Sequence, residues 1–503
     1  MSTSATGAFS VQTETETFLA KPDRQLLIDN QWRAAAGDKF PSLNPANNEP
    51  LAQIPEAVQA DVDAAVGAAR SALKSPGWRG LTGADRANLL WRLADLMEAS
   101  IDSLAELETL DQGKPLGVGR WAEIPGAIAQ FRFFAGQCTR LEGQTIPTSI
   151  NYQPEGKRML AYTRKQPVGV VAAIIPWNSP LIMAAMKLAP ALAAGCTVVL
   201  KPAEDTSLTA LRLGELILEA GFPPGVVNIV TGRGEVTGVA LAEHPDVDKV
   251  AFTGSTEVGR HILAASASNM KRVTLELGGK SPVIILPDAD LEPAIAGAAN
   301  AIFFNGGQVC VAGSRLYAHR SVYEQVVDGV TQAARAMTLG PGLDPQTQCG
   351  PLVSDHHANR VMGYVEAGRA DGAQIRCGGA RAEQPGAFVE PTVMTDVSPE
   401  MSVCRDEIFG PVLVCSPFDE IDEVVTWAND SQYGLAASVW TENLSTAHQL
   451  EEDLEAGTVW INCHSMFDAA LPIGGLKQSG WGRESGQQAV DNYLELKTVC
   501  AVV

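Results

Sequence analysis

Cys310 is the residue whose surroundings most clearly favour covalent chemistry. It lies in a loop between Gly306-Gly307 and Gly313, after an apolar run that predicts the end of a helix. Glycines on both sides let the backbone approach a ligand closely and leave backbone N–H groups free. A thiol on such a loop is a candidate nucleophile. The alternative is a small buried apolar residue, because free cysteine is among the residue types most often buried.

Glu276 is the second candidate, since it is a single carboxylate in a mainly apolar strand that ends at Gly278-Gly279. A buried lone carboxylate is costly, so it needs a partner or a function. A cysteine and a glutamate together suit thioester chemistry, in which the carboxylate takes a proton from water. None of the seven histidines lies in either stretch, so the sequence does not indicate a Cys–His pair.

The segments that must position these residues alternate between strand and helix from residue 168 onward. Continuous apolar runs predict strands at residues 168–175, 197–201, 226–230 and 249–252. Helices are expected between them, at residues 181–194, 206–220, 236–243 and 256–266. Such an alternation predicts a parallel sheet covered on both faces, with ligands at the carboxyl ends of its strands.

A second α/β run begins at residue 281, where a strand at 282–286 precedes the helix at 291–304 that delivers Cys310. The remaining strands of this run are expected at residues 412–416, 437–441 and 457–462. Its further helices are expected at residues 322–337 and 355–370, and earlier helices at 61–73, 83–108 and 121–138. The fold class is therefore α/β.

Two segments stand outside this pattern. Residues 144–166 alternate roughly between apolar and polar side chains and predict an extended arm, and residues 492–503 alternate enough to form a strand. An isolated ribbon is only marginally stable, so the arm should lie against something else. Residues 1–17 are rich in Ser, Thr and Glu and are expected to form a mobile tail.

Composition excludes several function classes. The chain has 503 residues and a net charge of −21, which argues against binding to nucleic acid or to an anionic membrane. Its nine cysteines include no C-x-x-C pair, so no metal site is expected, and a reducing cytoplasm is the expected compartment. The apolar stretch 181–200 is interrupted by Lys187 and Pro190, which favours a buried helix and strand over a membrane span.

Two glycine-containing loops could hold a phosphate. Residues 232–238 follow a strand but have the spacing G-x-G-x-x-x-G, one residue longer than the dinucleotide fingerprint. Residues 252–259 also join a strand to a helix, and Ser255 lies at the N-terminus of that helix, where free N–H groups favour an anion. Either loop could instead be an ordinary tight turn. Glu204, after the strand that ends at Lys201, could bind two ribose hydroxyls or form a surface ion pair.

Six segments, in this order, resemble the aldehyde dehydrogenase superfamily: Ile175-Pro176-Trp177-Asn178, Lys201-Pro202-Ala203-Glu204, Phe252-Thr253-Gly254-Ser255, Leu275-Glu276-Leu277-Gly278-Gly279-Lys280, the Cys310 loop, and Glu407-Ile408-Phe409-Gly410-Pro411. The resemblance implies two parallel-sheet α/β domains with a small β bridging arm. It implies an NAD-binding domain at 1–143 and 168–279, a catalytic domain at 280–479, and an oligomerisation arm and tail at 144–167 and 480–503.

The resemblance also implies roles for single residues. Cys310 would attack an aldehyde, Asn178 and the Cys310 backbone N–H would stabilise the oxyanion, and Glu276 would activate water. Lys187 and Glu484 match positions implicated in a proton relay, although both could be structural charges. The cofactor would be NAD, because Glu204 would repel a ribose phosphate, and the expected cofactor residues are Ile175, Trp177, Lys201, Glu204, Gly254, Ser255, Glu407 and Phe409. Glycine loop 252–259 is favoured for the pyrophosphate.

By the same resemblance, the substrate channel is apolar and is lined by Ser179, Ile182, Met183, Met186, Val309, Val311, Met466, Phe467 and Ile473. Ser179 stands where many relatives have Phe, which leaves room for a ring. Residues 162–167, 307–310 and 468–472 are similar to bacterial phenylacetaldehyde dehydrogenases. The expected reaction is oxidation of phenylacetaldehyde to phenylacetate, through a thiohemiacetal and a thioester.

Three alternatives remain at this point. The first is a dehydrogenase with a broad range of aliphatic and aromatic aldehydes. The second is a catalytically retired structural member of the superfamily, against which the intact Cys310, Glu276 and Asn178 argue. The third is an ordinary metabolite-binding α/β protein. The resemblance implies a homo-oligomer, with a tetramer favoured over a dimer.

Overall fold

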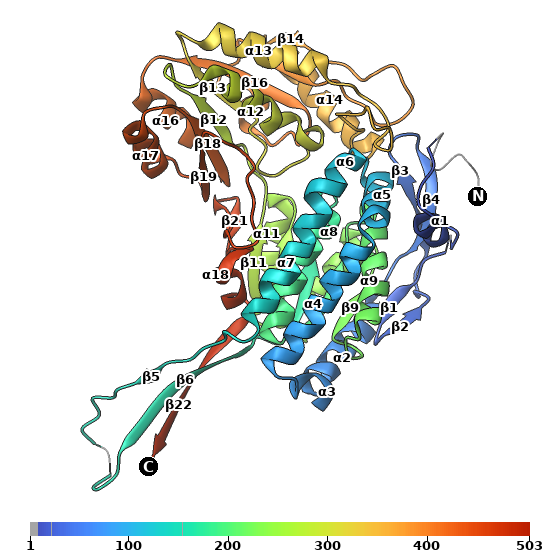
Figure 1. Cartoon of the computed structure of the whole chain (residues 1–503), viewed down its shortest axis with the longest axis vertical. Coiled ribbons are helices and arrows are strands. Elements are labelled where there is room, and N and C mark those ends of the chain that lie inside the picture. Colours follow the sequence, from blue (N-terminus) through green and yellow to red (C-terminus); the bar gives the residue numbers. More distant parts are fainter. Residues whose placement is uncertain (1–8, 22, 153) are drawn as a thin grey trace.

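Two large sheets and a projecting three-stranded arm organise the chain in the computed structural model, which describes residues 9–21, 23–152 and 154–503 (Figure 1). The fold class expected from the sequence is confirmed: both large sheets are mainly parallel and are flanked by helices. No helix among the described residues is long and apolar enough to cross a membrane.

The first sheet has eight strands within the described residues. In spatial order they are β2 (Gln31–Arg33), β1 (Leu26–Ile28), β9 (Val227–Ile229), β8 (Thr197–Lys201), β7 (Val170–Ile174), β10 (Lys249–Thr253), β11 (Arg272–Glu276) and β21 (Gly480–Trp481). Strands β9, β8, β7, β10 and β11 run parallel to one another, whereas β1 and β21 pair antiparallel with β9 and β11. Strands β7 and β8 are buried along their whole length. Burial on both faces explains their continuous apolar sequences.

Alternate residues of β7 pack into different helical layers, as the pleat of a strand requires. Val171 and Ala173 face one layer, formed by α4 (Gly83–Ala99), α5 (Ile101–Gln112), α7 (Ile124–Gln137), α8 (Pro180–Ala194) and α9 (Leu208–Ala220). Val170 and Ala172 face the other layer, formed by α2 (Gln59–Lys74), α10 (Val239–Glu243) and α11 (Thr256–Ser266). Helices cover both faces of the sheet, so a ligand can reach it only at the ends of its strands.

The second sheet has seven strands within the described residues. In spatial order they are β14 (Gln374–Cys377), β15 (Thr392–Thr395), β16 (Val412–Phe418), β13 (Arg315–His319), β12 (Pro282–Ile285), β18 (Ala436–Trp440) and β19 (Thr458–Ile461). Only the β14–β15 pair is antiparallel. The flanking helices are α12 (Leu291–Phe303), α13 (Tyr323–Ala336), α14 (Asp355–Ala370), α16 (Ile421–Asn429) and α17 (Leu444–Asp453).

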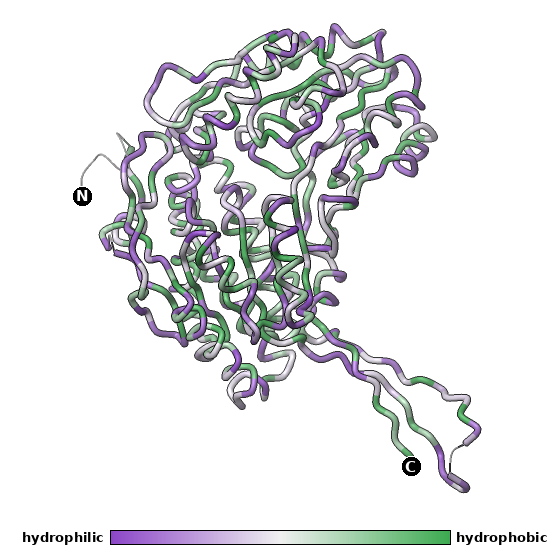
Figure 2. The backbone as a smooth tube through the Cα atoms, turned by 180° about the vertical axis from the view of Figure 1, so that it is seen from behind, coloured by the Kyte–Doolittle hydropathy of each residue, from purple (hydrophilic) through white to green (hydrophobic). Residues whose placement is uncertain are grey.

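The arm consists of β5 (Thr145–Ile146), β6 (Met159–Pro167) and β22 (Leu494–Val502), and it extends away from both sheets (Figure 1). Strand β22 pairs antiparallel with the full length of β6, from Leu494 opposite Pro167 to Val502 opposite Met159. Figure 2 shows apolar as well as polar segments along the arm. Leu496 and Val502 remain more than half exposed, so the arm presents apolar surface to its surroundings.

Shorter elements connect these units. The strands are β3 (Lys39–Asn44), β4 (Glu49–Pro55), β17 (Tyr433–Gly434) and β20 (Leu476–Lys477). The short helices are α1 (Thr13–Leu19), α3 (Pro76–Arg79), α6 (Leu116–Val118), α15 (Ser402–Arg405), α18 (Gly486–Asp491), the π-helices η1 (Gly119–Glu123) and η3 (Gly234–Gly238), and the 3₁₀ turns η2 (Glu204–Thr206) and η4 (Phe304–Gly307).

Two local predictions were wrong. The helix expected at 83–108 is two helices, because Ser100 leaves the helical region with φ −105° and ψ 20° and its hydroxyl donates to Glu14. The tail expected at 1–17 is helical from Thr13, since Phe18 is buried under the Arg24 guanidinium. Residues 1–8 of that prediction lie outside the described residues.

Candidate active site

The carboxyl ends of four neighbouring strands of the first sheet converge on one edge. Ile175 and the residues after it follow β7, Lys201 ends β8, Gly254 follows β10, and Glu276 ends β11. Along the chain, β7 to β9 run toward one side of the sheet, whereas β10 and β11 lie on the other side of β7. Such a reversal of strand order opens a crevice between β7 and β10, where parallel α/β sheets bind their ligands.

The second sheet brings Cys310 to this edge through the loop between α12 and β13. Asn305, Gly306 and Gly307 adopt positive φ angles of 50°, 63° and 73°, which turn the chain sharply after α12. A Cβ on Gly307 would lie 2.1 Å from the carbonyl oxygen of Gly410, and a Cβ on Gly279 would lie 2.4 Å from that of Cys310. A side chain at either position would collide with the backbone. Glycine is therefore required at 307, in the Cys310 loop, and at 279, in the segment that contacts this loop.

Asn178 is held against the Cys310 loop by hydrogen bonds in both directions. Its Nδ2 donates to the carbonyl of Gln308 at 2.9 Å, and Asn305 Nδ2 donates to the Asn178 carbonyl at 3.1 Å. Gln308 is itself fixed, because its Oε1 accepts from the backbone N–H of Val353 at 2.9 Å. An amide nitrogen carries two hydrogens, so Asn178 Nδ2 keeps one donor for an oxyanion.

A buried acid–base group surrounds Glu276. Lys187 of α8 is fully buried, pairs with Glu484 Oε1 and donates to Thr253 Oγ1 at 2.7 Å. Glu276 Oε1 has no hydrogen-bond partner in the described part of the chain. Burial, followed by repulsion from Glu484, raises the pKa of Glu276 well above its ordinary value, and Lys187 opposes this increase. A carboxyl with a raised pKa is a stronger base than an ordinary carboxylate once it is deprotonated.

The thiol of Cys310 is also shifted toward its neutral form. Removal from solvent, followed by repulsion from Glu407 and Glu276, raises the pKa of Cys310 to about 12. Glu407 accepts a hydrogen bond from the Gly279 N–H at 2.9 Å, yet burial raises the pKa of Glu407 to about 7. A positive charge brought to this site would lower the pKa of the thiol and increase the fraction present as the nucleophilic thiolate.

The residues expected to hold the cofactor lie around the same crevice. Ser255 caps α11, with its Oγ accepting from the Val258 N–H at 3.3 Å, so the first turn of that helix faces the crevice with free donors. Lys201 Nζ lies 3.6 Å from Glu204 Oε2, and Gly234 N–H points to Glu204 Oε1 at 3.5 Å. The glycine loop before η3 therefore borders Glu204, the residue expected to bind the ribose.

An aromatic corner closes the other end of the crevice. Phe409 has a positive φ of 61°, and its ring meets the Trp177 ring edge-on at 5.2 Å. His357 supports both: its ring lies 5.0 Å from Trp177, and its Nε2 lies 2.7 Å from the Phe409 carbonyl. Sequence reasoning missed His357, because it lies on α14, far from every motif. The crevice thus has charged side chains after β8, the N-terminus of α11, and the aromatic rings of Trp177 and Phe409. This set of groups fits a dinucleotide such as NAD.

The residues expected to line the substrate channel divide between two packed clusters. Ile182 and Met183 pack with the helices of the first sheet, whereas Val309 and Ile473 pack with Cys310, Val311 and Trp460. Met186 and Val311 are buried, and Ser179 is buried with its hydroxyl turned to Glu123. Met466 and Phe467 are more than half exposed, and Phe467 meets the Trp460 ring edge-on at 5.7 Å.

Two further contacts belong to this region and were not expected from the sequence. A Cβ on Gly126 of α7 would lie 2.7 Å from Ile182 Cδ1, so that position has room only for glycine in the present packing. Trp121 is exposed and meets the Phe304 ring edge-on at 6.1 Å. Neither residue carries a local pattern, since each acts through a partner more than fifty positions away.

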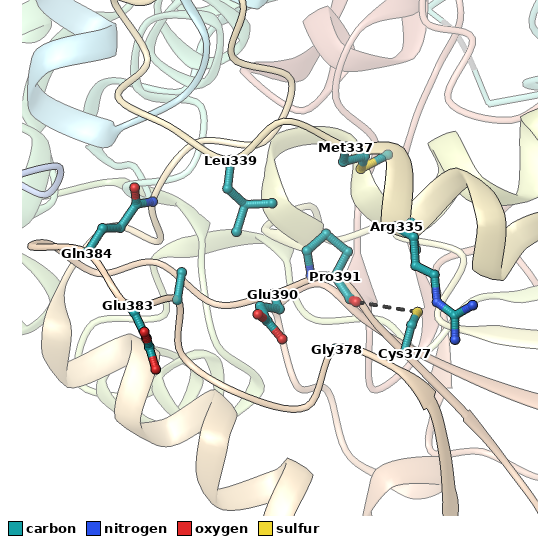
Figure 3. A pocket seen from close by; sticks show the side chains of 11 residues that line it. Arg335, Met337, Leu339, Cys377, Gly378, Glu383, Gln384, Glu390 and Pro391 are labelled. Atoms are coloured by element: carbon teal, nitrogen blue, oxygen red, sulfur yellow. Dashed lines mark hydrogen bonds between the residues drawn. The ribbon is translucent and has the colours of Figure 1, made fainter.

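A separate hollow of about 420 Å³ lies on the second sheet between α13 and β14 (Figure 3). It is lined by Arg335, Cys377, Glu383 and Glu390, among others, and contains none of the candidate catalytic, cofactor or channel residues. The Cys377 thiol lies 3.7 Å from the Pro391 carbonyl. Among the described residues there is no group of three or more His, Cys, Asp or Glu side chains that could hold a metal ion.

A thiol, an amide donor and a buried carboxyl at the edge of a dinucleotide crevice define a thiol-dependent oxidoreductase. The aldehyde dehydrogenase family model matches residues 32–499, and the chain belongs to this family. It is an NAD-dependent aldehyde dehydrogenase.

Individual relatives agree over nearly the whole chain. It is 52% identical to DhaS of Bacillus subtilis (strain 168), whose name gives this family and no substrate, over 96% of each chain. It is 50% identical to a phenylacetaldehyde dehydrogenase of Pseudomonas fluorescens over 94% of this chain and 95% of the other. The NAD+ complex of a Bacillus cereus aldehyde dehydrogenase superimposes with a TM-score of 0.96 and 49% identity, covering 98% of this chain and 99% of that one.

Proposed function

We propose that this enzyme oxidises arylacetaldehydes, with phenylacetaldehyde as the best substrate and phenylacetate as the product. The observation that carries the proposal is the apolar character of the nine residues expected to line the channel, which include no Arg or Lys. A substrate with a free carboxylate would need a cationic partner to offset its desolvation. The 50% identity to a phenylacetaldehyde dehydrogenase supports the same choice.

Cys310 begins the proposed reaction. Its sulfur forms a bond to the aldehyde carbon as the thiol passes its proton to water. The electron pair of the carbonyl double bond moves to the oxygen, which becomes negatively charged. The free hydrogen of Asn178 Nδ2 and the Cys310 backbone N–H stabilise that charge, because fixed donors need little reorganisation. A bound NAD would supply the acceptor for the hydride that leaves the carbon attached to Cys310.

Glu276 serves the second half of the reaction. Its unpaired Oε1 takes a proton from water, and the water oxygen bonds to the thioester carbon as the bond to Cys310 breaks. The acid is released and Cys310 is left as its thiolate, which takes a proton from solvent. Lys187 and Glu484 then move the proton away from Glu276, a role that their direct ion pair supports. Lys201, Glu204, Gly254, Ser255, Glu407, Phe409, Ile175 and Trp177 hold the cofactor in this proposal.

A panel of aldehydes assayed with NAD tests the substrate. Phenylacetaldehyde should give the highest kcat/KM, followed by hexanal, and should exceed betaine aldehyde and succinic semialdehyde by at least about tenfold. Ser179→Phe should lower kcat/KM for phenylacetaldehyde more than for acetaldehyde, which needs less room and serves as the control. A charged aldehyde that wins by tenfold would contradict the apolar-channel argument.

Glu204 gives a second prediction, on the choice between NAD and NADP. Glu204→Ala should lower the ratio of kcat/KM for NAD over NADP by about fivefold, the effect expected for roughly 1 kcal/mol at a partly exposed charge. The reason is the loss of repulsion against a ribose phosphate. Glu219→Ala, which removes an exposed carboxylate from α9, is the control and should leave the ratio unchanged. An unchanged ratio in Glu204→Ala would refute this role.

We further propose a homo-oligomer, a tetramer rather than a dimer, in the cytoplasm. The exposed apolar residues of the arm support association, because contiguous exposed apolar surface is typical of protein–protein contacts. Nine free cysteines suit a reducing compartment.

A further inference from the structure

Three ionisable side chains are buried behind the channel, and the reaction proposed above uses none of them. Lys114 and Glu108 are 1% or less exposed, and Glu123 is 6% exposed. Lys114 Nζ lies 2.6 Å from Glu108 Oε1 and 3.5 Å from Glu123 Oε1. We call these residues the Lys114 cluster. Removing such charges from water costs free energy that their mutual attraction often fails to recover, so stability alone is a weak reason for the cluster.

The Lys114 cluster holds the segment that follows Asn178. Ser179 Oγ donates to Glu123 Oε1 at 3.1 Å. Ser179 stands at the N-cap position of α8, where a serine oxygen ordinarily accepts from the first turn of its own helix. Here the Ser179 side chain makes no such cap. The start of α8 is thus fixed by the cluster instead of by its own cap.

The backbone around Glu123 has an unusual helical geometry. Residues Gly119–Glu123 form the π-helix η1, a geometry that is rare and frequent at functional sites. Within η1, Trp121 is 68% exposed and Glu123 is buried, with Oε2 unpaired in the described part of the chain. The π-helical backbone and the unpaired oxygen both concern Glu123, the residue of η1 whose side chain contacts Ser179.

We propose that Glu123 is a positioning residue for the oxidation step. Through the Ser179 hydroxyl it fixes the backbone immediately after Asn178, so that Asn178 Nδ2 lies where the oxyanion forms. Asn178 is tied to the Cys310 loop on one side, through Gln308 and Asn305, and Glu123 supplies the tie on the other side. This inference rests on the proposed role of Asn178 as oxyanion donor.

Two substitutions of similar size separate this role from a structural one. Glu123→Gln keeps an oxygen that accepts from Ser179 but loses the charge that faces Lys114, whereas Glu123→Leu loses both. Glu123→Leu should slow the burst of reduced cofactor about tenfold with little change in KM, and Glu123→Gln should restore the rate to within about threefold. Both should lower Tm by similar amounts. Equal losses of rate in the two variants would overturn the proposal, because the rate would then follow stability.

A double-mutant cycle tests the route through Asn178. Glu123→Leu added to Asn178→Ala should cause no further loss of burst rate, because no donor remains to be positioned. A further tenfold loss would overturn the inference alone. A normal burst rate in Asn178→Ala would overturn both the role of Asn178 and this inference. Should Glu123→Leu fail to fold, Ser179→Ala removes the same hydrogen bond and leaves the Lys114 cluster intact, and an unchanged burst rate in that variant would contradict the proposal.

Discussion

Replacing Cys310 with alanine is expected to lower kcat by at least a thousandfold, a loss of about 4 kcal/mol in barrier terms. The sulfur forms the covalent bond through which both halves of the proposed reaction proceed. The loop that carries it is held by backbone contacts to Gly279 and Gly410, so alanine at 310 should leave its conformation unchanged. Steady-state formation of reduced cofactor with phenylacetaldehyde measures the effect.

Two controls make the Cys310 result specific. Binding of NAD to Cys310→Ala should be retained, since the residues expected to hold the cofactor lie on other loops. Cys463→Ala removes a second thiol from the same packed cluster and should keep kcat within a few fold. More than about a thousandth of the original kcat in Cys310→Ala would show that another group is the nucleophile.

Replacing Glu276 with glutamine should have the second largest effect, and it should fall on thioester hydrolysis. Glutamine keeps the shape but cannot accept the proton from water. The expected trace is a normal burst of reduced cofactor followed by a steady state slower by about a hundredfold or more. In the unaltered enzyme, hydrolysis should rise with pH through a pKa above that of an ordinary carboxyl, because burial raises the pKa of Glu276 and only its deprotonated form is a base.

Lys187 is a charged neighbour of Glu276 that also belongs to the proposed relay, and its replacement tests the effect of charge on Glu276. Lys187→Met should shift the rise of the hydrolysis rate to higher pH, because Lys187 opposes the increase in the pKa of Glu276. It should leave the burst in place. If Glu276→Gln loses the burst together with turnover, Glu276 acts earlier, in removing the proton from Cys310.

The strands were predictable because a strand that is buried on both faces has a continuous apolar sequence. Residues 197–201 were expected as a strand and form β8 with the same bounds, and α14 also matches the expected 355–370. The break at Ser100 was not predictable, since the apolar spacing continues across it and a distant contact to Glu14 decides the geometry. Strand β21 was missed because two residues carry no periodicity.

The candidate site divides in the same way. Cys310 and Glu276 were singled out because glycines and a strand end surround them in the sequence itself, whereas Asn178 was named through the resemblance to the family. Glu123 and His357 were missed because their contacts, to Ser179 and to Phe409, lie more than fifty residues away and leave no local pattern. The sequence therefore indicates glycine-containing loops and strand ends, whereas the distant side chains that contact them can be identified only in the folded structure.

The pairing of β21 with β11 has a consequence for how the enzyme is made. Gly480 lies opposite Glu276, although 204 residues separate them along the chain. A ribosome that adds roughly 5 to 20 residues per second needs about 10 to 40 s to cover that distance. During that time the nascent chain carries Glu276 on an open sheet edge, and Glu484 has not yet been synthesised. Glu484 is thus added only after the whole second sheet has been synthesised, whereas Lys187 is already present. The buried group around Glu276 is therefore completed only after Cys310 has been synthesised.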